Sequence, residues 1–206
     1  MPVNKKPRME AVNDAPYFRN RSESFVDSAD VILELDSGER LPAHSFPLSF
    51  HSGVLSDMLS LKTSGDSPFQ VLPLPECTLD AALRLLDCIY ANSRDNTVSV
   101  EGAEAVLELV NKFGMTGILK DIDSILADKA AADGSSSALW GGDVNEAVHW
   151  LIMACCNNMM RLAARAERFL LQADARLSDS PEAVHIPPSL LLHMLDSHHG
   201  DAGDCK

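Results

Sequence analysis

The order of the first elements is set by residues 30–48, DVILELDSGERLPAHSFPL. The odd-numbered positions of Val31–Leu35 are all apolar, and this period of two predicts a partly buried β-strand. Gly38 lies in the following polar turn, where a positive φ is often needed. A second extended stretch at 40–45 contains Pro42, which lacks an N–H and therefore favours an edge strand or a bulge. The stretch predicts a β-hairpin.

The rest of the chain predicts one more clear strand and many helices. Strands are expected at 69–74 and, more weakly, at 97–100, and helices are expected at 51–61, at 79–90 with Thr78 as its cap, at 103–113 and around 118–126. Gly114 is expected to end the third of these helices in a left-handed conformation. Beyond a Gly- and Ser-rich connection, a helix is expected from Asp143, which with Glu146 forms a D-x-x-E variant of the capping box, and further helices are expected over 159–177 and over 189–198.

Charge and composition restrict the possible partners. The chain has 206 residues, 46% of them hydrophobic, which is enough for a packed core without disulfides or metal. It has 17 Lys and Arg against 30 Asp and Glu, a formal net charge of −13. A field of this sign repels phosphate backbones and anionic lipids, so we expect the folded body to bind neither nucleic acid nor membranes.

The cysteines and the apolar runs favour an intracellular protein. Cys77, Cys88, Cys155, Cys156 and Cys205 fit no zinc-binding or disulfide spacing, and we expect one of the adjacent pair to be packed and the other partly exposed. The longest apolar run, 150–156, is too short to span a bilayer, and there is no apolar segment at the start. We expect a cytoplasmic protein. The basic run 5–8 is either a solvated tail or a nuclear-import signal.

Several motifs occur in one order over about 25–130. The segments are DVIL at 30–33, LPAHSFPL at 41–48, SGVLSDML at 52–59, LPLP at 72–75, LLDCIY at 85–90 and ELVNKFGM at 108–115. Together they resemble the signature segments of BTB/POZ domains, which are protein-interaction modules. The later segment occupies the place of the helical BACK extension that follows some of these domains.

The resemblance implies an α/β (α+β) BTB/POZ fold, with a small mixed sheet flanked by helices and followed by an all-helical extension. We expect a flexible tail at 1–24, the BTB/POZ domain at 25–131, a linker at 132–142, a BACK-like extension at 143–198 and a flexible tail at 199–206.

One face of such domains often binds the cullin-3 scaffold. Carried over by resemblance, this face would include Met58, Leu61, Thr63 and Phe113, with the aromatic ring of Phe113 at the surface. The alternative is that the apolar members are ordinary core. Cullin-binding relatives commonly have a hydrophobic-x-Glu motif after the helix that corresponds to 51–61, which carries Met58. Here that place falls on residues 63–65, which are Thr, Ser and Gly.

The candidate chemical groups favour structural roles. Asp30 and His44 match signature positions of the family, and His44 has no nucleophile motif or second metal ligand at usable spacing. The histidines, Asp201 and Cys205 of 193–205 fit no metal-ligand pattern, and Gly200 and Gly203 favour a solvated end. No phosphate-binding glycine motif or nucleophile elbow occurs. We therefore expect no catalytic, cofactor or metal site.

The leading hypothesis is a non-enzymatic adaptor that links a substrate to a cullin-3 ubiquitin ligase and forms a homodimer. The alternative is a homo-oligomerisation or scaffolding module in transcriptional or cytoskeletal assemblies, with no cullin role. No kelch, zinc-finger or ankyrin pattern supplies a separate substrate-binding domain.

Overall fold

A computed structural model describes the chain over 16–61, 69–91, 98, 100–131, 139–172, 180–188 and 191. Its contacts fall into two compact units, Met1–Leu119 and Lys120–Lys206. The division lies within one helix, α8 (Thr116–Ala131), whereas the sequence places a linker at 132–142. Residues 132–138 lie outside the described residues, so the expected domain limits stay a prediction there.

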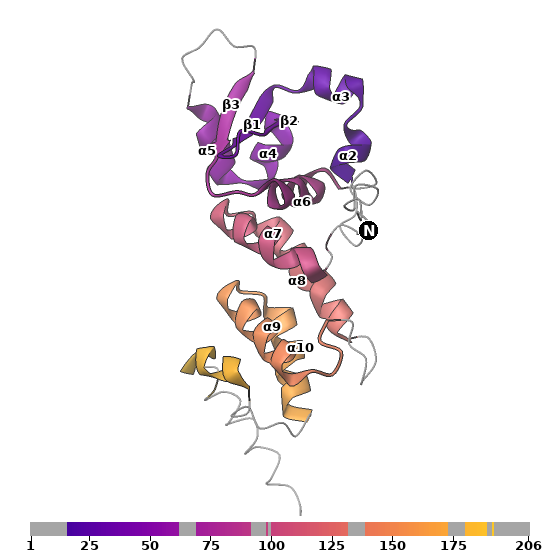
Figure 1. The fold of residues 1–206 in the computed structure, drawn as a ribbon, viewed down its shortest axis with the longest axis vertical. Coiled ribbons are helices and arrows are strands. Elements are labelled where there is room, and N and C mark those ends of the chain that lie inside the picture. The colour runs from indigo at the N-terminus through magenta and orange to yellow at the C-terminus, as the bar shows by residue number, and fades with distance from the viewer. Residues whose placement is uncertain are drawn as a thin grey trace, which may run out of the picture. The chain divides into compact units, whose positions relative to one another are not determined.

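The first unit contains a three-stranded mixed sheet in the order β2-β1-β3 (Figure 1). The strands are β1 (Val31–Leu35), β2 (Arg40–Ala43) and β3 (Gln70–Leu74). β1 pairs antiparallel with β2 and parallel with β3. The predicted hairpin is confirmed: Gly38 has a φ of 93°, and Pro42 lies on the edge strand. Alternate residues of β1 are buried, as its period of two predicts.

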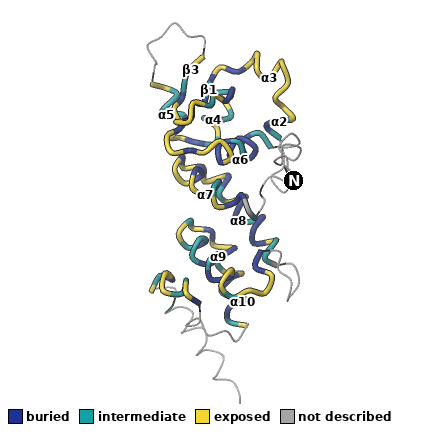
Figure 2. The backbone as a smooth tube through the Cα atoms, in the orientation of Figure 1, coloured by how far each residue is buried: buried dark blue, intermediate teal, exposed yellow. Residues whose placement is uncertain are grey.

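The described helices of this unit are α2 (Pro16–Asn20), α3 (Glu23–Ser28), α4 (Ser45–His51), α5 (Gly53–Ser60), α6 (Leu79–Tyr90), α7 (Val100–Lys112) and the first turn of α8. The sequence did not predict α4, and it placed residue 45 in a strand. Its weak strand at 97–100 is wrong at Val100, which begins α7; residues 97 and 99 lie outside the described residues. Along the helices, buried and exposed positions alternate with the helical period (Figure 2).

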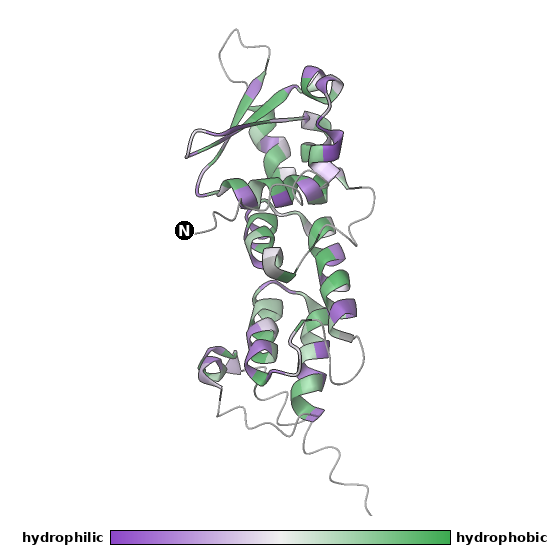
Figure 3. Ribbon diagram, turned by 45° about the vertical axis from the view of Figure 1, so that its right-hand side comes forward, coloured by the Kyte–Doolittle hydropathy of each residue, from purple (hydrophilic) through white to green (hydrophobic). Residues whose placement is uncertain are grey.

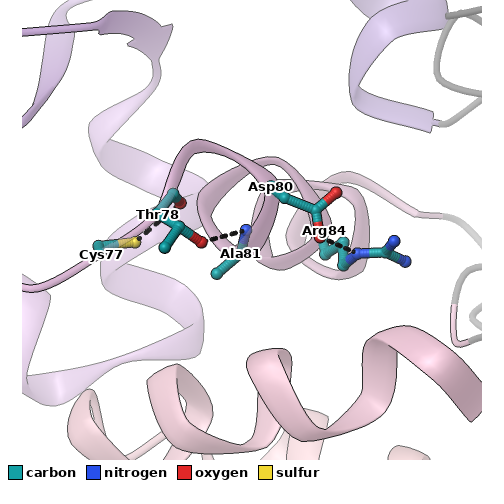
Figure 4. A network of polar contacts seen from close by, with 5 residues as sticks. All are labelled: Cys77, Thr78, Asp80, Ala81 and Arg84. Atoms are coloured by element: carbon teal, nitrogen blue, oxygen red, sulfur yellow. Dashed lines mark hydrogen bonds and ion pairs between the residues drawn. The ribbon is translucent and has the colours of Figure 1, made fainter. Parts of the chain in front are cut away.

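The N-terminus of α6 is capped as the sequence predicts. The Thr78 hydroxyl accepts a hydrogen bond from the Ala81 N–H at 3.3 Å. In the same first turn, the Asp80 carboxylate pairs with the guanidinium of Arg84, four residues further along, at 2.7 Å (Figure 4). Both contacts use groups within four residues of each other, which explains why a local sequence pattern predicts them.

Residues 16–24 form helices packed onto the domain, so the expected flexible tail at 1–24 is wrong for this part. Tyr17 is 0% exposed, and its hydroxyl donates to the Pro42 carbonyl at 2.8 Å. Its backbone N–H donates to the Asp87 carboxylate at 3.1 Å. The Tyr17 ring also meets the rings of Phe25 and Tyr90 at 5.7 Å. The buried side chain of Tyr17 holds this segment against the domain. The sequence of the segment has no sustained periodicity from which its helices could be predicted.

Phe113 is also placed differently from the expectation. Its side chain is 3% exposed, so the predicted surface position of its ring is wrong. Its carbonyl accepts a hydrogen bond from the Ser52 hydroxyl at 2.6 Å, and the same hydroxyl caps α5 by accepting from the Leu55 N–H at 2.9 Å. The next residue, Gly114, has a φ of 60° and ends α7, as predicted. The left-handed turn directs Phe113 into the core.

The second unit is helical in its described part. It contains the rest of α8, α9 (Val144–Cys156), α10 (Met160–Gln172) and the 3₁₀-helix η2 (Pro181–His185), which the sequence did not predict. The Asp143 carboxylate caps α9 by accepting from the Asn145 N–H at 2.8 Å, which confirms the predicted cap. α9 packs against α10 and η2. The helix expected over 189–198 lies almost wholly outside the described residues.

Hydrophobic side chains make the core of each unit, and the ribbon coloured by hydropathy shows bands of hydrophobic and hydrophilic residues along the helices (Figure 3). In the first unit the fully buried residues include Leu33, Leu48, Leu86 and Leu107. An α+β domain with a small mixed sheet and a helical extension is thus the observed architecture, as the sequence predicts.

A first prediction concerns Asp87. Burial raises the pKa of its carboxyl from 3.8 to about 6, against the lowering effect of the Tyr17 N–H, Arg84 and Arg19. Between these values the folded chain binds a proton that the unfolded chain has released. The contribution of Asp87 to the free energy of unfolding therefore falls as pH rises from 3.8 to about 6, and it stays low above that.

Asn at this position keeps an acceptor for the Tyr17 N–H and does not titrate. We expect Asp87→Asn to be more stable than the parent chain at pH 7, by on the order of 1–2 kcal/mol, and to lose this part of the pH dependence. Urea unfolding of both chains across this pH range measures the difference. Parallel pH profiles would contradict the role given to Asp87.

A second prediction follows from the burial of Phe113. Phe113→Ala leaves a cavity, so it should lower the free energy of unfolding by about 3 kcal/mol or more. Leu61→Ala is the control, because Leu61 is 70% exposed and its truncation should cost less than about 0.5 kcal/mol. Urea unfolding monitored by circular dichroism tests both. If Phe113→Ala lowers the free energy of unfolding by less than about 1 kcal/mol, the burial of the Phe113 ring is contradicted.

Candidate protein-interaction surface

Two phenylalanines stand exposed on α4. Phe46 is 77% exposed and Phe50 is 73% exposed, whereas Leu48 between them is buried. The two rings stack with centroids 6.2 Å apart and planes 29° apart. Positions four apart share one face of a helix, so Leu48 anchors α4 while the aromatic pair (Phe46 and Phe50) faces outward. Large exposed aromatic rings of this kind are typical of protein-binding surfaces.

The sequence analysis did not single out the aromatic pair. A signal was present: two phenylalanines one helical turn apart flank a single leucine in SFPLSFH at 45–51. Because the helix was not predicted, this pattern was not recognised: in an extended segment Phe46, Leu48 and Phe50 would all lie on one face, whereas in a helix Leu48 lies on the face opposite the two phenylalanines.

Exposed apolar side chains are also found on α5. Val54 is 43% exposed and Leu61, at the C-cap, is 70% exposed, whereas Leu55 is buried. Met58 is half-buried. Of the residues predicted for the cullin-type face, Met58 and Leu61 therefore lie at or near the surface, and Phe113 lies in the core. Thr63 lies outside the described residues.

Asp30 connects the sheet to α4. Its carboxylate accepts from the Ser45 N–H at 2.7 Å and from the Ser45 hydroxyl at 2.5 Å. The residue at the N-cap position of α4, His44, makes no side-chain cap, so the Asp30 carboxylate satisfies the first turn in its place. This contact sets the direction in which the aromatic pair projects.

His44 is held by hydrogen bonds on both ring nitrogens. Its Nδ1 lies 2.9 Å from the Tyr90 hydroxyl, which also accepts from the His44 backbone N–H at 2.9 Å. The Tyr90 O–H is then left to donate to Nδ1. Nε2–H in turn donates to the Ser28 hydroxyl at 3.0 Å, and that hydroxyl donates to the Phe25 carbonyl at 3.1 Å. This tautomer satisfies each donor in the chain.

The surroundings of His44 are aromatic and structural. Burial raises the pKa of Tyr90 to about 12, against the lowering effect of the His44 N–H, so its hydroxyl stays protonated over the physiological range. The Phe25 ring lies edge-on to the imidazole, with centroids 4.6 Å apart. The imidazole thus links α3 to the end of β2 and to α6.

The described residues were also compared with the requirements of metal binding, membrane insertion and cysteine chemistry. Among them no three His, Cys, Asp or Glu side chains come close enough to hold a metal ion. No helix of that part of the chain has both the length and the apolar character needed to cross a bilayer. Cys77 and Cys88 are buried, Cys155 is half-buried and Cys156 is exposed, so the two adjacent cysteines differ in exposure, but neither is fully packed as was expected of one of them. Burial raises the pKa of the Cys155 thiol.

Comparisons with known proteins identify the domain. The family profile of the BTB/POZ domain matches residues 19–130, more than half of the 206-residue chain. Fifty-one chains of solved structures match. One, the BTB domain of zebrafish PATZ1, is 16% identical, with 58% of this chain and 90% of that chain covered and a TM-score of 0.42. A comparison with curated proteins gives no match.

The matched residues run from α2 into α8 and include the mixed sheet, Asp30, His44 and the aromatic pair. Since the family profile covers this whole set of elements, the chain belongs to the BTB/POZ domain family, whose members are protein–protein interaction modules.

Proposed function

We propose that this chain acts by binding rather than by catalysis, as an adaptor that associates with a second copy of itself and recruits further proteins. The observation that carries this proposal is the exposed aromatic pair of α4. Each ring exposes apolar area that costs free energy in water, and covering both rings against a partner recovers it. An intracellular adaptor, in the cytoplasm or the nucleus, is the setting we propose for this role.

A second copy of the chain is the first partner we propose for the aromatic pair. In a twofold dimer the same patch lies on both partners, so an aromatic helix face packs against its own symmetry mate. Val54, 43% exposed, is a further exposed apolar residue on the next helix, α5. The rings lie on a helix held by Leu48 and Asp30, so little backbone entropy is lost on binding.

A third prediction tests this contact. The double variant Phe46→Ser, Phe50→Ser should change a dimer into a monomer without loss of folding, because both side chains are more than 70% exposed. Light scattering measures the mass, and circular dichroism checks the fold. Val184→Ser, at a residue 80% exposed in the second unit, is the matched control and should stay dimeric. A monomeric parent chain, or a dimeric double variant, would exclude this interface.

We also propose cullin-3 as a partner, bound through a face that includes Met58, Leu61 and Thr63. The 70% exposure of Leu61 at the end of α5 supports this proposal, because an exposed leucine side chain at a helix end can fill a pocket of cullin-3. Phe113 does not contribute a ring to the face. The absence of a hydrophobic-x-Glu motif at 63–65 means that Leu61 must supply the apolar anchor.

A fourth prediction tests the cullin contact by calorimetric titration of the full chain with the cullin-3 N-terminal domain. We expect a sub-micromolar dissociation constant, and Leu61→Asp should weaken binding by about tenfold or more. Val184→Asp is the control with the same change of charge at another exposed apolar residue, and it should bind like the parent chain. If the parent chain does not bind, the alternative function follows: self-association or scaffolding without a cullin role.

A further inference from the structure

α10 presents three arginines on one face. Arg161, Arg165 and Arg168 follow each other at spacings of four and three residues, and all three are exposed. The opposite face carries the buried residues Leu162, Ala166 and Leu170. Because positions three and four apart lie together on a helix, the three guanidinium groups form a continuous stripe, the α10 arginine stripe.

The stripe is unusual in its electrostatic setting. The whole chain has a net charge of −13, and residues 120–206 contain 7 Lys and Arg against 13 Asp and Glu. Even so, within the part of the chain that the structure describes, no carboxylate forms an ion pair with Arg165 or Arg168. Surface arginines in an acidic protein would gain from pairing with its own carboxylates. With respect to the described residues, these two guanidinium groups can pair with the carboxylates of another protein.

The first turn of α10 is firmly held. The buried Asp123 carboxylate accepts from the Arg161 N–H at 3.1 Å and from the Leu162 N–H at 2.8 Å. The Arg161 guanidinium donates to the Ser124 hydroxyl at 2.6 Å and lies 3.6 Å from the Asp128 carboxylate. These contacts all lie within the second unit. They fix the backbone of α10 on α8, so the positions from which the arginine side chains extend are set before a partner binds.

Apolar surface adjoins the arginines. Met160 is 73% exposed, and Ala164 is exposed one turn further along. By helical spacing Ala164 lies between Arg161 and Arg168, and Met160 adjoins Ala164 at the start of the helix. A face that combines guanidinium groups with a flexible apolar side chain matches an acidic peptide that also carries an apolar residue.

We propose that the α10 arginine stripe is a docking site for an acidic segment of a protein partner. Its guanidinium groups would pair with the partner's Asp or Glu carboxylates, and Met160 would cover an adjacent apolar side chain. A nucleic acid fits less well, because a long polyanion also meets the field of a chain with charge −13. A short acidic peptide contacts the stripe alone.

The test uses the full chain and a short fluorescein-labelled peptide of glutamates with one central leucine, followed by fluorescence anisotropy. The test variant is Arg165→Gln, Arg168→Gln. The matched control, Arg40→Gln, Lys120→Gln, removes the same charge at exposed positions outside the stripe. Gln retains good helix propensity at the substituted helical positions, so both variants should fold.

We expect the stripe variant to bind the acidic peptide about tenfold more weakly than the parent chain and the control to bind within about twofold of it. Binding should weaken as salt rises from about 50 to about 300 mM. Equal losses in both variants would mean that net charge alone attracts the peptide, and would overturn the proposal. So would an absence of peptide binding, or stronger binding of a labelled RNA oligonucleotide or of phosphatidylserine vesicles.

Discussion

The hydrogen bonds of Asp30 hold together the elements on which the interaction surface depends. Its N–H donates to the Ala43 carbonyl at 3.2 Å, and its carbonyl accepts from the Gln70 N–H at 3.0 Å. The backbone of one residue thus joins β1 to both neighbouring strands. Its carboxylate at the same time binds Ser45 and caps α4. Asp30 therefore fixes the start of α4 relative to the sheet. The orientation of the aromatic pair on α4 depends on this contact.

Buried polar contacts make the same kind of connection elsewhere. The Ser52 hydroxyl joins the start of α5 to the end of α7 through the Phe113 carbonyl, 61 positions along the chain. The Tyr17 N–H joins α2 to α6 through Asp87, 70 positions away. A buried donor without its acceptor costs on the order of 1–3 kcal/mol, so each contact selects one arrangement of distant segments. The apolar core stabilises the domain, and these few polar groups determine which packing it adopts.

Features that depend on neighbouring residues could be predicted from the sequence, and features that depend on distant ones could not. The hairpin around Gly38, the caps Thr78 and Asp143 and the left-handed Gly114 all follow local rules and are confirmed. The helices of 16–28, by contrast, depend on contacts of Tyr17 with Pro42, Asp87 and Tyr90, which lie far away in the sequence. Phe113 was misplaced because a family resemblance assigned its face, whereas the turn at Gly114 and the Ser52 contact decide it.

The exposed aromatic pair and the α10 arginine stripe differ in the physics by which they would bind. Burial of Phe46 and Phe50 is driven by the hydrophobic effect, which moderate salt changes little. Pairing at Arg165 and Arg168 is electrostatic and is screened by salt over a Debye length of about 8 Å at physiological ionic strength. The two surfaces therefore select for opposite properties of a partner, because one favours an apolar face and the other favours an acidic segment. Two binding chemistries on one chain are what we expect of an adaptor.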